Sequence, residues 1–155
     1  MISKDLIDQA RHLAQRATKK PRIADLCRAQ SAAYYALFHE LCFQCAGSLL
    51  GFTAAAQQEP KWVGLYRKLA HGDAKKRCQK RAVITAISPI IVGPATLFAA
   101  LQEKRHLADY DPAHRPLKGA VLRDIEQAEI AIDQLKALPE AKRREFALFL
   151  LYGQE

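Results

Sequence analysis

The chain has 155 residues, of which 50% are hydrophobic, and it carries a net charge of +8 with a sequence pI of about 9.5. This length predicts a single domain over residues 1–155, and the hydrophobic content excludes a disordered chain. The basic balance favours a polyanionic partner such as a nucleic acid, but it describes association rather than fold.

Hydrophobic residues recur at a helical period, and no segment alternates with the period of two that is typical of a strand. The first helix is expected over residues 3–17, with Ser3 as its N-cap. The stretch from Ala24 to Cys45 contains no Gly or Pro and predicts a long central helix from Ile23 to about Leu50. Further helices are expected over residues 61–69, where Trp62, Leu65 and Tyr66 face inward, and over residues 95–109, 118–138 and 140–152. Residues 74–81 are expected to form only a short basic helix. The longer segments therefore predict an all-α fold, an antiparallel bundle of about five to six helices.

The expected central helix has two different faces. Leu26, Gln30, Leu37 and Leu41 repeat on a wide, mainly apolar face, with Tyr34 beside them, and this face predicts contact with the core. A second face carries a cation, a phenol, an imidazole and a thiol, from Arg28, Tyr35, His39 and Cys42. We treat Arg28, Tyr35 and His39 as binding candidates. The alternative is a solvated Arg28 and a half-buried His39 without a ligand.

The four cysteines are Cys27, Cys42, Cys45 and Cys78. No apolar signal segment follows Met1, so we expect a cytoplasmic protein with free thiols. Cys42 and Cys45 form a C-x-x-C after His39, which leaves a zinc site open, with Cys78 or His71 as fourth ligand. The pair lies in mid-helix and a second such pair is missing. The pattern therefore favours packing of the thiols, and we expect no metal and no cofactor.

Residues 61–81 contain eight Lys and Arg against one Asp. Such a cluster is typical of a nucleic-acid footprint, and a solvated basic surface is the alternative. The binding candidates in this segment are His71, Lys75, Lys76 and Arg77. His71 and Gly72 also predict a helix end, with Gly72 as the left-handed C-cap.

Residues 82–102 carry no charge and have the length of a membrane helix. Ser88-Pro89 and Gly93-Pro94 interrupt this segment near its centre. Two such breakers favour a buried loop and a helix start, so we expect no membrane span.

Two segments resemble parts of the HEPN domains (higher eukaryote and prokaryote nucleotide-binding). The run CRAQSAAYYALFH, from Cys27 to His39, resembles the family's central helix, and the run RHLADYD, from Arg105 to Asp111, resembles the end of a later helix. The resemblance implies an all-α bundle that is usually dimeric. Many members are metal-independent endoribonucleases, and some act as toxins beside a nucleotidyltransferase partner. We therefore expect RNA or a nucleotide as ligand, a homodimer, and a place for a nucleotidyltransferase-type partner protein.

Arg105 matches the arginine of the family's nuclease motif. Catalytic members carry a histidine at a short, fixed spacing after it, whereas here His106 follows directly and His114 lies too far on. This departure favours a module that binds RNA or nucleotides. The resemblance also implies a role in a toxin–antitoxin or defence system. A metal-independent endoribonuclease is the alternative, and its candidate residues are Arg105, His106, Asp109 and Tyr110.

Cleavage of RNA without a metal needs a base for the 2′-hydroxyl and a cation for the phosphate. Arg105 would be the cation, and His106, His114 or His39 the base. A structural ion pair between Arg105 and Asp109 is the competing interpretation. A helical bundle that binds a partner protein, unrelated to RNA, is a third possibility. The apolar runs Ile87–Val92 and Phe146–Leu151 further favour a homodimer.

Overall fold

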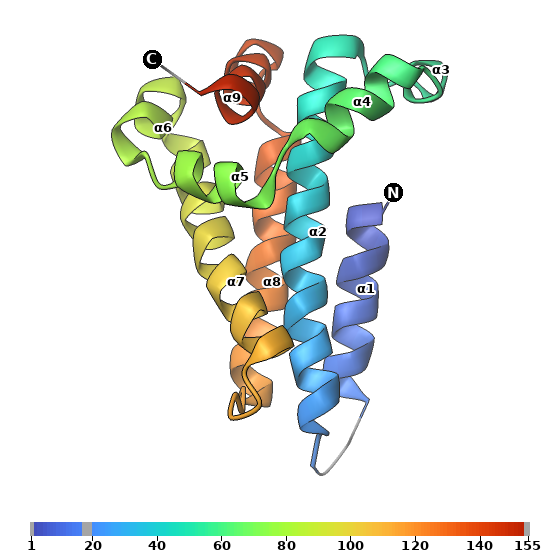
Figure 1. Cartoon of the computed structure of the whole chain (residues 1–155), viewed down its shortest axis with the longest axis vertical. Helices are drawn as coiled ribbons and strands as arrows, with labels where there is room; N and C mark the ends of the chain where they lie inside the picture. Colours follow the sequence, from blue (N-terminus) through green and yellow to red (C-terminus); the bar gives the residue numbers. More distant parts are fainter. Residues whose placement is uncertain (1, 17–19, 154–155) are drawn as a thin grey trace.

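The computed structural model describes residues 2–16 and 20–153, and over these residues it contains nine α-helices, one short 3₁₀ helix and no strand (Figure 1). The elements are α1 (Ile2–Gln15), α2 (Ile23–Leu50), α3 (Ala54–Gln57), α4 (Pro60–Lys68), α5 (His71–Cys78), α6 (Arg81–Ile87), η1 (Pro89–Ile91), α7 (Val92–Tyr110), α8 (Lys118–Lys136) and α9 (Glu140–Tyr152). The predicted all-α bundle is confirmed. The number of helices exceeds the expected five to six, because short helices also form in segments expected to be loops.

The four helices α1, α2, α7 and α8 form an antiparallel bundle along the long axis of the molecule, with successive helices running in opposite directions (Figure 1). The shorter elements α3–α6 and α9 gather at one end of this bundle. Helix α2 contacts α1, α4, α7, α8 and α9. It is therefore the axis around which the two halves of the chain pack.

Helix α2 is buried on nearly all sides. Leu26, Leu37 and Leu41 lie in the core, as the sequence predicts, at 2%, 0% and 2% exposure. The expected polar face is narrower than predicted, because Ala32 and Cys42 are also buried. A helix that is apolar almost all round needs neighbours on every side, which explains the packing of helices from both ends of the chain around α2.

The end of α2 depends on two glycines. A Cβ atom added at Gly47 would lie 2.1 Å from Cε1 of Phe52, so the ring of Phe52 packs directly on the backbone of the helix. Gly51 follows with a φ of +98°, which L-residues with side chains rarely adopt. Trp62 Nε1 donates a hydrogen bond to the carbonyl of Gly51 at 2.9 Å. These contacts fold α3 and α4 back against the end of α2.

Two predicted helix ends are wrong. Ser3 lies inside α1, where its hydroxyl donates to Glu40 Oε2 at 3.0 Å, so it is not the N-cap. Helix α1 ends at Gln15, and residue 17, its predicted end, lies outside the described residues. Gly72 is not a C-cap but lies in the first turn of α5. The chain turns instead at the extended residues Leu69 and Ala70, because Leu69 is drawn into the core at 4% exposure.

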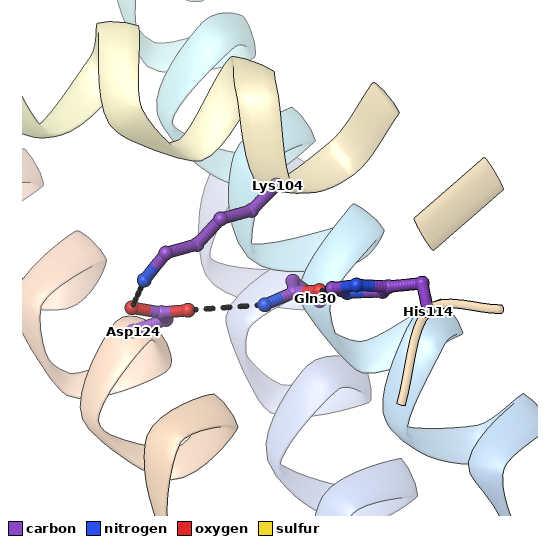
Figure 2. A network of polar contacts seen from close by, with 4 residues as sticks. All are labelled: Gln30, Lys104, His114 and Asp124. Atoms are coloured by element: carbon purple, nitrogen blue, oxygen red, sulfur yellow. Dashed lines mark hydrogen bonds and ion pairs between the residues drawn. The ribbon is translucent and has the colours of Figure 1, made fainter. Parts of the chain in front are cut away.

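A buried polar network joins α2, α7, α8 and the loop after α7 (Figure 2). Gln30, on the face expected to be apolar, is 3% exposed, and its Nε2 donates to Asp124 Oδ2 at 3.3 Å. Lys104 Nζ donates to Asp124 Oδ1 at 2.8 Å. The Oε1 of Gln30 lies 2.8 Å from His114 Nε2, and since an amide oxygen only accepts, that nitrogen carries the proton. His114 is thus engaged in holding the loop.

The uncharged segment 82–102, expected to be a buried loop and a helix start, is divided among α6, η1 and α7, so short helices form where the loop was expected. In the part of the chain that the structure describes, no helix has both the length and the apolar character needed to cross a bilayer. Helix α7 begins at Val92, slightly before the expected start at residue 95.

Candidate functional site

The two segments that resemble the HEPN domains meet where α7 packs against α2. The guanidinium carbon of Arg105 lies 5.1 Å from the ring centre of Tyr34 and 5.8 Å from that of Tyr35. Arg105 NH1 also lies 3.6 Å from Asp109 Oδ2, one helical turn away, with side chains 14% and 31% exposed. Arg105 is therefore held by two aromatic rings and a carboxylate while part of its cation stays accessible.

His71 joins this cluster from α5. Its ring stacks on Phe38 with centres 3.8 Å apart, and its Nδ1 lies 2.5 Å from the hydroxyl of Tyr34. Burial raises the pKa of Tyr34 far above its usual range, so the phenol keeps its proton and can donate it to Nδ1. In that arrangement the neutral imidazole of His71 carries its own proton on Nε2, whereas in the other tautomer Nδ1–H donates to the phenol oxygen and Nε2 is the free proton acceptor.

A second histidine, His39, is held in a similar way. Its Nδ1 lies 2.5 Å from the hydroxyl of Tyr66 on α4. Burial lowers the pKa of His39. The pKa of His71 is lowered first by burial and then by the charges of Arg105 and His39. Both imidazoles are therefore neutral near pH 7, and a neutral imidazole is the form that accepts a proton.

An open groove of about 760 Å³ runs beside this cluster, between α1, α2 and α7. Its apolar wall comes from α1, with Ile2, Leu6 and Leu13. Its floor and opposite wall carry Arg28, Ser31, Tyr35, His39, Asp109 and Tyr110. The groove thus combines an apolar side, aromatic rings and polar groups of both signs.

The structure brings five of the predicted site residues together in this groove: Arg28, Tyr35, His39, Asp109 and Tyr110. Tyr110 is 69% exposed, and its ring centre lies 5.0 Å from that of His106. His106 and Arg105 line a neighbouring hollow of about 370 Å³ between α5 and α7. Most of the candidates therefore lie in two adjacent depressions that meet at His106 and Tyr110, whereas His71, Lys76 and Arg77 line neither of them.

The three predicted basic residues of α5 lie in different environments. Lys75 Nζ lies 3.1 Å from Glu103 Oε1 on α7. The guanidinium of Arg77 donates to the backbone carbonyl of Leu150 and so ties α5 to α9. Lys76 is exposed. Only Lys75 is adjacent to Arg105, and Arg77 has a structural role that charge counting does not reveal.

The cysteines of the C-x-x-C pair are core residues. Cys42 and Cys45 are 2% and 0% exposed, and burial raises the pKa of Cys42 to about 12. Within residues 2–16 and 20–153, no three His, Cys, Asp or Glu side chains are grouped so that they could hold a metal ion. The zinc alternative therefore finds no ligand set in this part of the chain, and the two thiols pack as small apolar groups.

Sequence reasoning missed Tyr34 and Tyr66 as site residues, because it assigned both to apolar faces. Their hydroxyl groups bind histidines 37 and 27 positions away, respectively. The available signal was the placement of a polar hydroxyl on a face expected to be buried, since a buried phenol needs a hydrogen-bond partner.

Comparisons of the chain with models of known protein families, with curated proteins and with solved structures found no match.

Proposed function

We propose that the protein binds RNA or a nucleotide along the groove between α1, α2 and α7 and the adjoining hollow between α5 and α7, where Arg105 is the cation that binds phosphate. The observation that carries the proposal is the contact of Arg105 with Tyr34 and Tyr35, which joins the two HEPN-like segments in one site. A guanidinium is always charged and can grip a phosphate with two donors. Because Asp109 and the aromatic rings hold the side chain in place, little of its freedom remains to be lost on binding.

The groove also suits the other parts of a single-stranded RNA. Tyr35 and Tyr110 offer ring faces on which bases can stack, and Arg28 adds a second cation at the opposite wall. The basic excess of the chain attracts a polyanion from a distance. Binding of this kind is expected to weaken steeply as salt is raised.

The test is the affinity of a labelled single-stranded oligouridylate, measured by fluorescence anisotropy at low salt. Arg105→Gln should weaken binding by about tenfold or more, since it removes a charged, two-donor contact. Arg144→Gln is the matched control, because Arg144 is an exposed arginine on α9, away from the groove. An equal loss in both variants, or no binding by the parent protein, would contradict the proposal.

The second candidate is metal-independent RNA cleavage, and the position of His71 favours it. His71 on α5 lies close enough to Arg105 and to His39 for their charges to lower its pKa, so a histidine lies near Arg105 in space although none follows it at the family's spacing. An imidazole takes the proton of the 2′-hydroxyl, and the 2′-oxygen bonds to the phosphorus. The bond to the 5′-oxygen breaks, and the imidazolium returns its proton to that oxygen. The products are a 2′,3′-cyclic phosphate and a 5′-hydroxyl.

This second candidate is tested with RNA cleavage in EDTA. His71→Ala and His39→Ala should each remove cleavage that the parent shows, while His106→Ala, which changes an exposed ring, should reduce it less. Cleavage that persists in Arg105→Ala would refute the role of the guanidinium. RNA that is bound but never cut by the parent would leave the binding function alone.

We also propose, from the family resemblance, a cytoplasmic homodimer that works with a nucleotidyltransferase-type partner. The apolar runs that favoured a dimer are largely used inside the chain, since Ile87, Ile91 and Phe146 are buried. Ile90 and Leu148 remain 54% and 43% exposed. The dimer is tested by light scattering over a wide concentration range, and binding of a protein partner without any RNA affinity would favour the interaction-module alternative.

A further inference from the structure

The hollow between α5 and α7 is separate from the groove, and Arg105 lines the hollow while its ion-pair partner Asp109 lines the groove. It holds about 370 Å³ and is lined by Lys75, Gln102, Glu103, Arg105, His106 and Leu107. His106 on this side packs against Tyr110, which lines the groove, so the two depressions adjoin along the last turns of α7. A flexible chain lying in the groove therefore has a direct continuation into the hollow.

Two buried polar atoms of the hollow's lining residues have no hydrogen-bond partner, Gln102 Oε1 and Arg105 Nε. A buried polar group without a partner costs free energy, and such groups are rare in folded proteins. One atom accepts and the other donates. A ligand with both hydroxyl donors and anionic oxygens can supply partners for both, and a ribose-phosphate backbone has both.

Lys75 is a second cation that lines this hollow, and it forms an ion pair with Glu103. Their side chains lie 3.1 Å apart and are 29% and 64% exposed. An ion pair with so much solvent access contributes little to stability, so a phosphate can displace the carboxylate at small cost. Glu103 therefore acts as a weak internal competitor for Lys75.

We propose that Lys75 forms a second phosphate subsite in this hollow, which takes the phosphate next to the one bound at Arg105 and does so by displacing Glu103 from Lys75. The inference rests on the proposed binding of RNA and narrows its ligand to a single strand with consecutive phosphates. Glu103 sets the affinity of the site by masking one cation. Removal of the carboxylate should therefore strengthen binding, because Lys75 is then free to bind phosphate.

The experiment measures the affinity of a fluorescein-labelled single-stranded oligouridylate of about ten nucleotides at several salt concentrations. Lys75→Gln should weaken binding by about five- to tenfold and lower the salt slope by about one, the signature of one lost phosphate contact. Glu103→Gln should tighten binding several-fold. In the double variant Lys75→Gln/Glu103→Gln the gain should disappear, because no lysine remains to be unmasked.

The pair Lys142 and Glu145 on α9 is a matched control, with nitrogen and oxygen 3.5 Å apart and side chains 44% and 54% exposed. Lys142→Gln and Glu145→Gln make the same charge changes at residues that do not line the hollow. Neither should alter affinity as strongly as its counterpart at the hollow. A gain from Glu103→Gln that persists without Lys75, or an equal gain from Glu145→Gln, would overturn the subsite and indicate a general charge effect.

The result for Arg105→Gln separates this inference from the proposed function. Loss of binding in Arg105→Gln with no change in Lys75→Gln would overturn the second subsite and leave the RNA groove in place. No binding by the parent would overturn both. Circular dichroism melts of every variant confirm that the changes in affinity come from folded protein.

Discussion

Arg105 and Tyr34 lie face to face, with the guanidinium carbon 5.1 Å from the ring centre, although they belong to helices α7 and α2 at distant points of the chain. Tyr34 is fully buried and its hydroxyl contacts His71 on α5. Tyr34 therefore contacts both the guanidinium of Arg105 on α7 and the imidazole of His71 on α5. Substitution of Arg105 should therefore change the stability of the fold as well as the binding of a ligand.

The contribution of Arg105 to stability can be measured directly. Arg105→Ala should lower the free energy of unfolding by about 1–3 kcal/mol, because it removes a cation from two ring faces and a partly exposed ion pair. Arg105→Lys should cost less, since the charge over the rings is kept. Urea denaturation gives both values. An unchanged midpoint in Arg105→Ala would show that the rings gain nothing from the cation.

The two neutral histidines make stability depend on pH. Folding lowers the pKa of His39 and His71 below the ordinary value of 6.5, so the unfolded chain binds protons more readily. Well above pH 6.5 the two histidines do not change the free energy of unfolding. This free energy falls as the pH drops through 6.5 toward the pKa of the folded state. The urea midpoint should therefore be lower at about pH 5 than at about pH 7.5. The variant His39→Gln/His71→Gln should lose less over this range, and an equal loss would place the effect elsewhere.

Two serines with buried hydroxyl groups provide a matched pair. Ser3 donates to Glu40 Oε2 at 3.0 Å, and Glu40 is 0% exposed. Ser3→Ala should cost about 1–3 kcal/mol, because a buried carboxyl group loses a hydrogen-bond donor. The hydroxyl of Ser48 is buried without a partner, so Ser48→Ala should be nearly neutral or stabilising. Thermal melts compare the two, and a larger loss from Ser48→Ala would reverse the assignment.

Two helical glycines differ in a similar way. In Gly47→Ala the new methyl group would lie 2.1 Å from Phe52, and moving that ring should cost about 1–3 kcal/mol. Gly64 has open space around it in α4, so Gly64→Ala should stabilise the protein by about 0.5–1 kcal/mol. Denaturation midpoints shifted in opposite directions are the expected result. Two shifts of the same sign would show that the Phe52 ring yields freely.

Much of the fold follows from local sequence rules. The absence of Gly and Pro between Ile23 and Ala46 predicts α2 with the bounds that the structure has. The failure at Gly72 has a physical reason, since glycine is compatible with both a helix interior and a C-cap. The burial of Leu69, a tertiary contact, decided the position of the turn. Local propensity contains no information about that contact.

The site was predictable only in part. Arg28, Tyr35 and His39 share a helix face by periodicity alone, and they do line one groove. The contacts that complete the site join separate helices, such as Tyr34 with His71 and Tyr66 with His39. Pairing between distant segments depends on how the helices pack, so one sequence without its fold could not show which histidine lies near Arg105.

The burial of α2 on nearly every side has a consequence for synthesis at the ribosome. Helix α2 leaves the ribosome after α1 but before α7, α8 and α9, all of which cover it. Helix α1 can shield only one side, so the nascent helix exposes apolar surface until almost the whole chain has been made. A chain truncated before Glu140 lacks α9 and should collect in aggregates or on chaperones rather than as a smaller folded bundle.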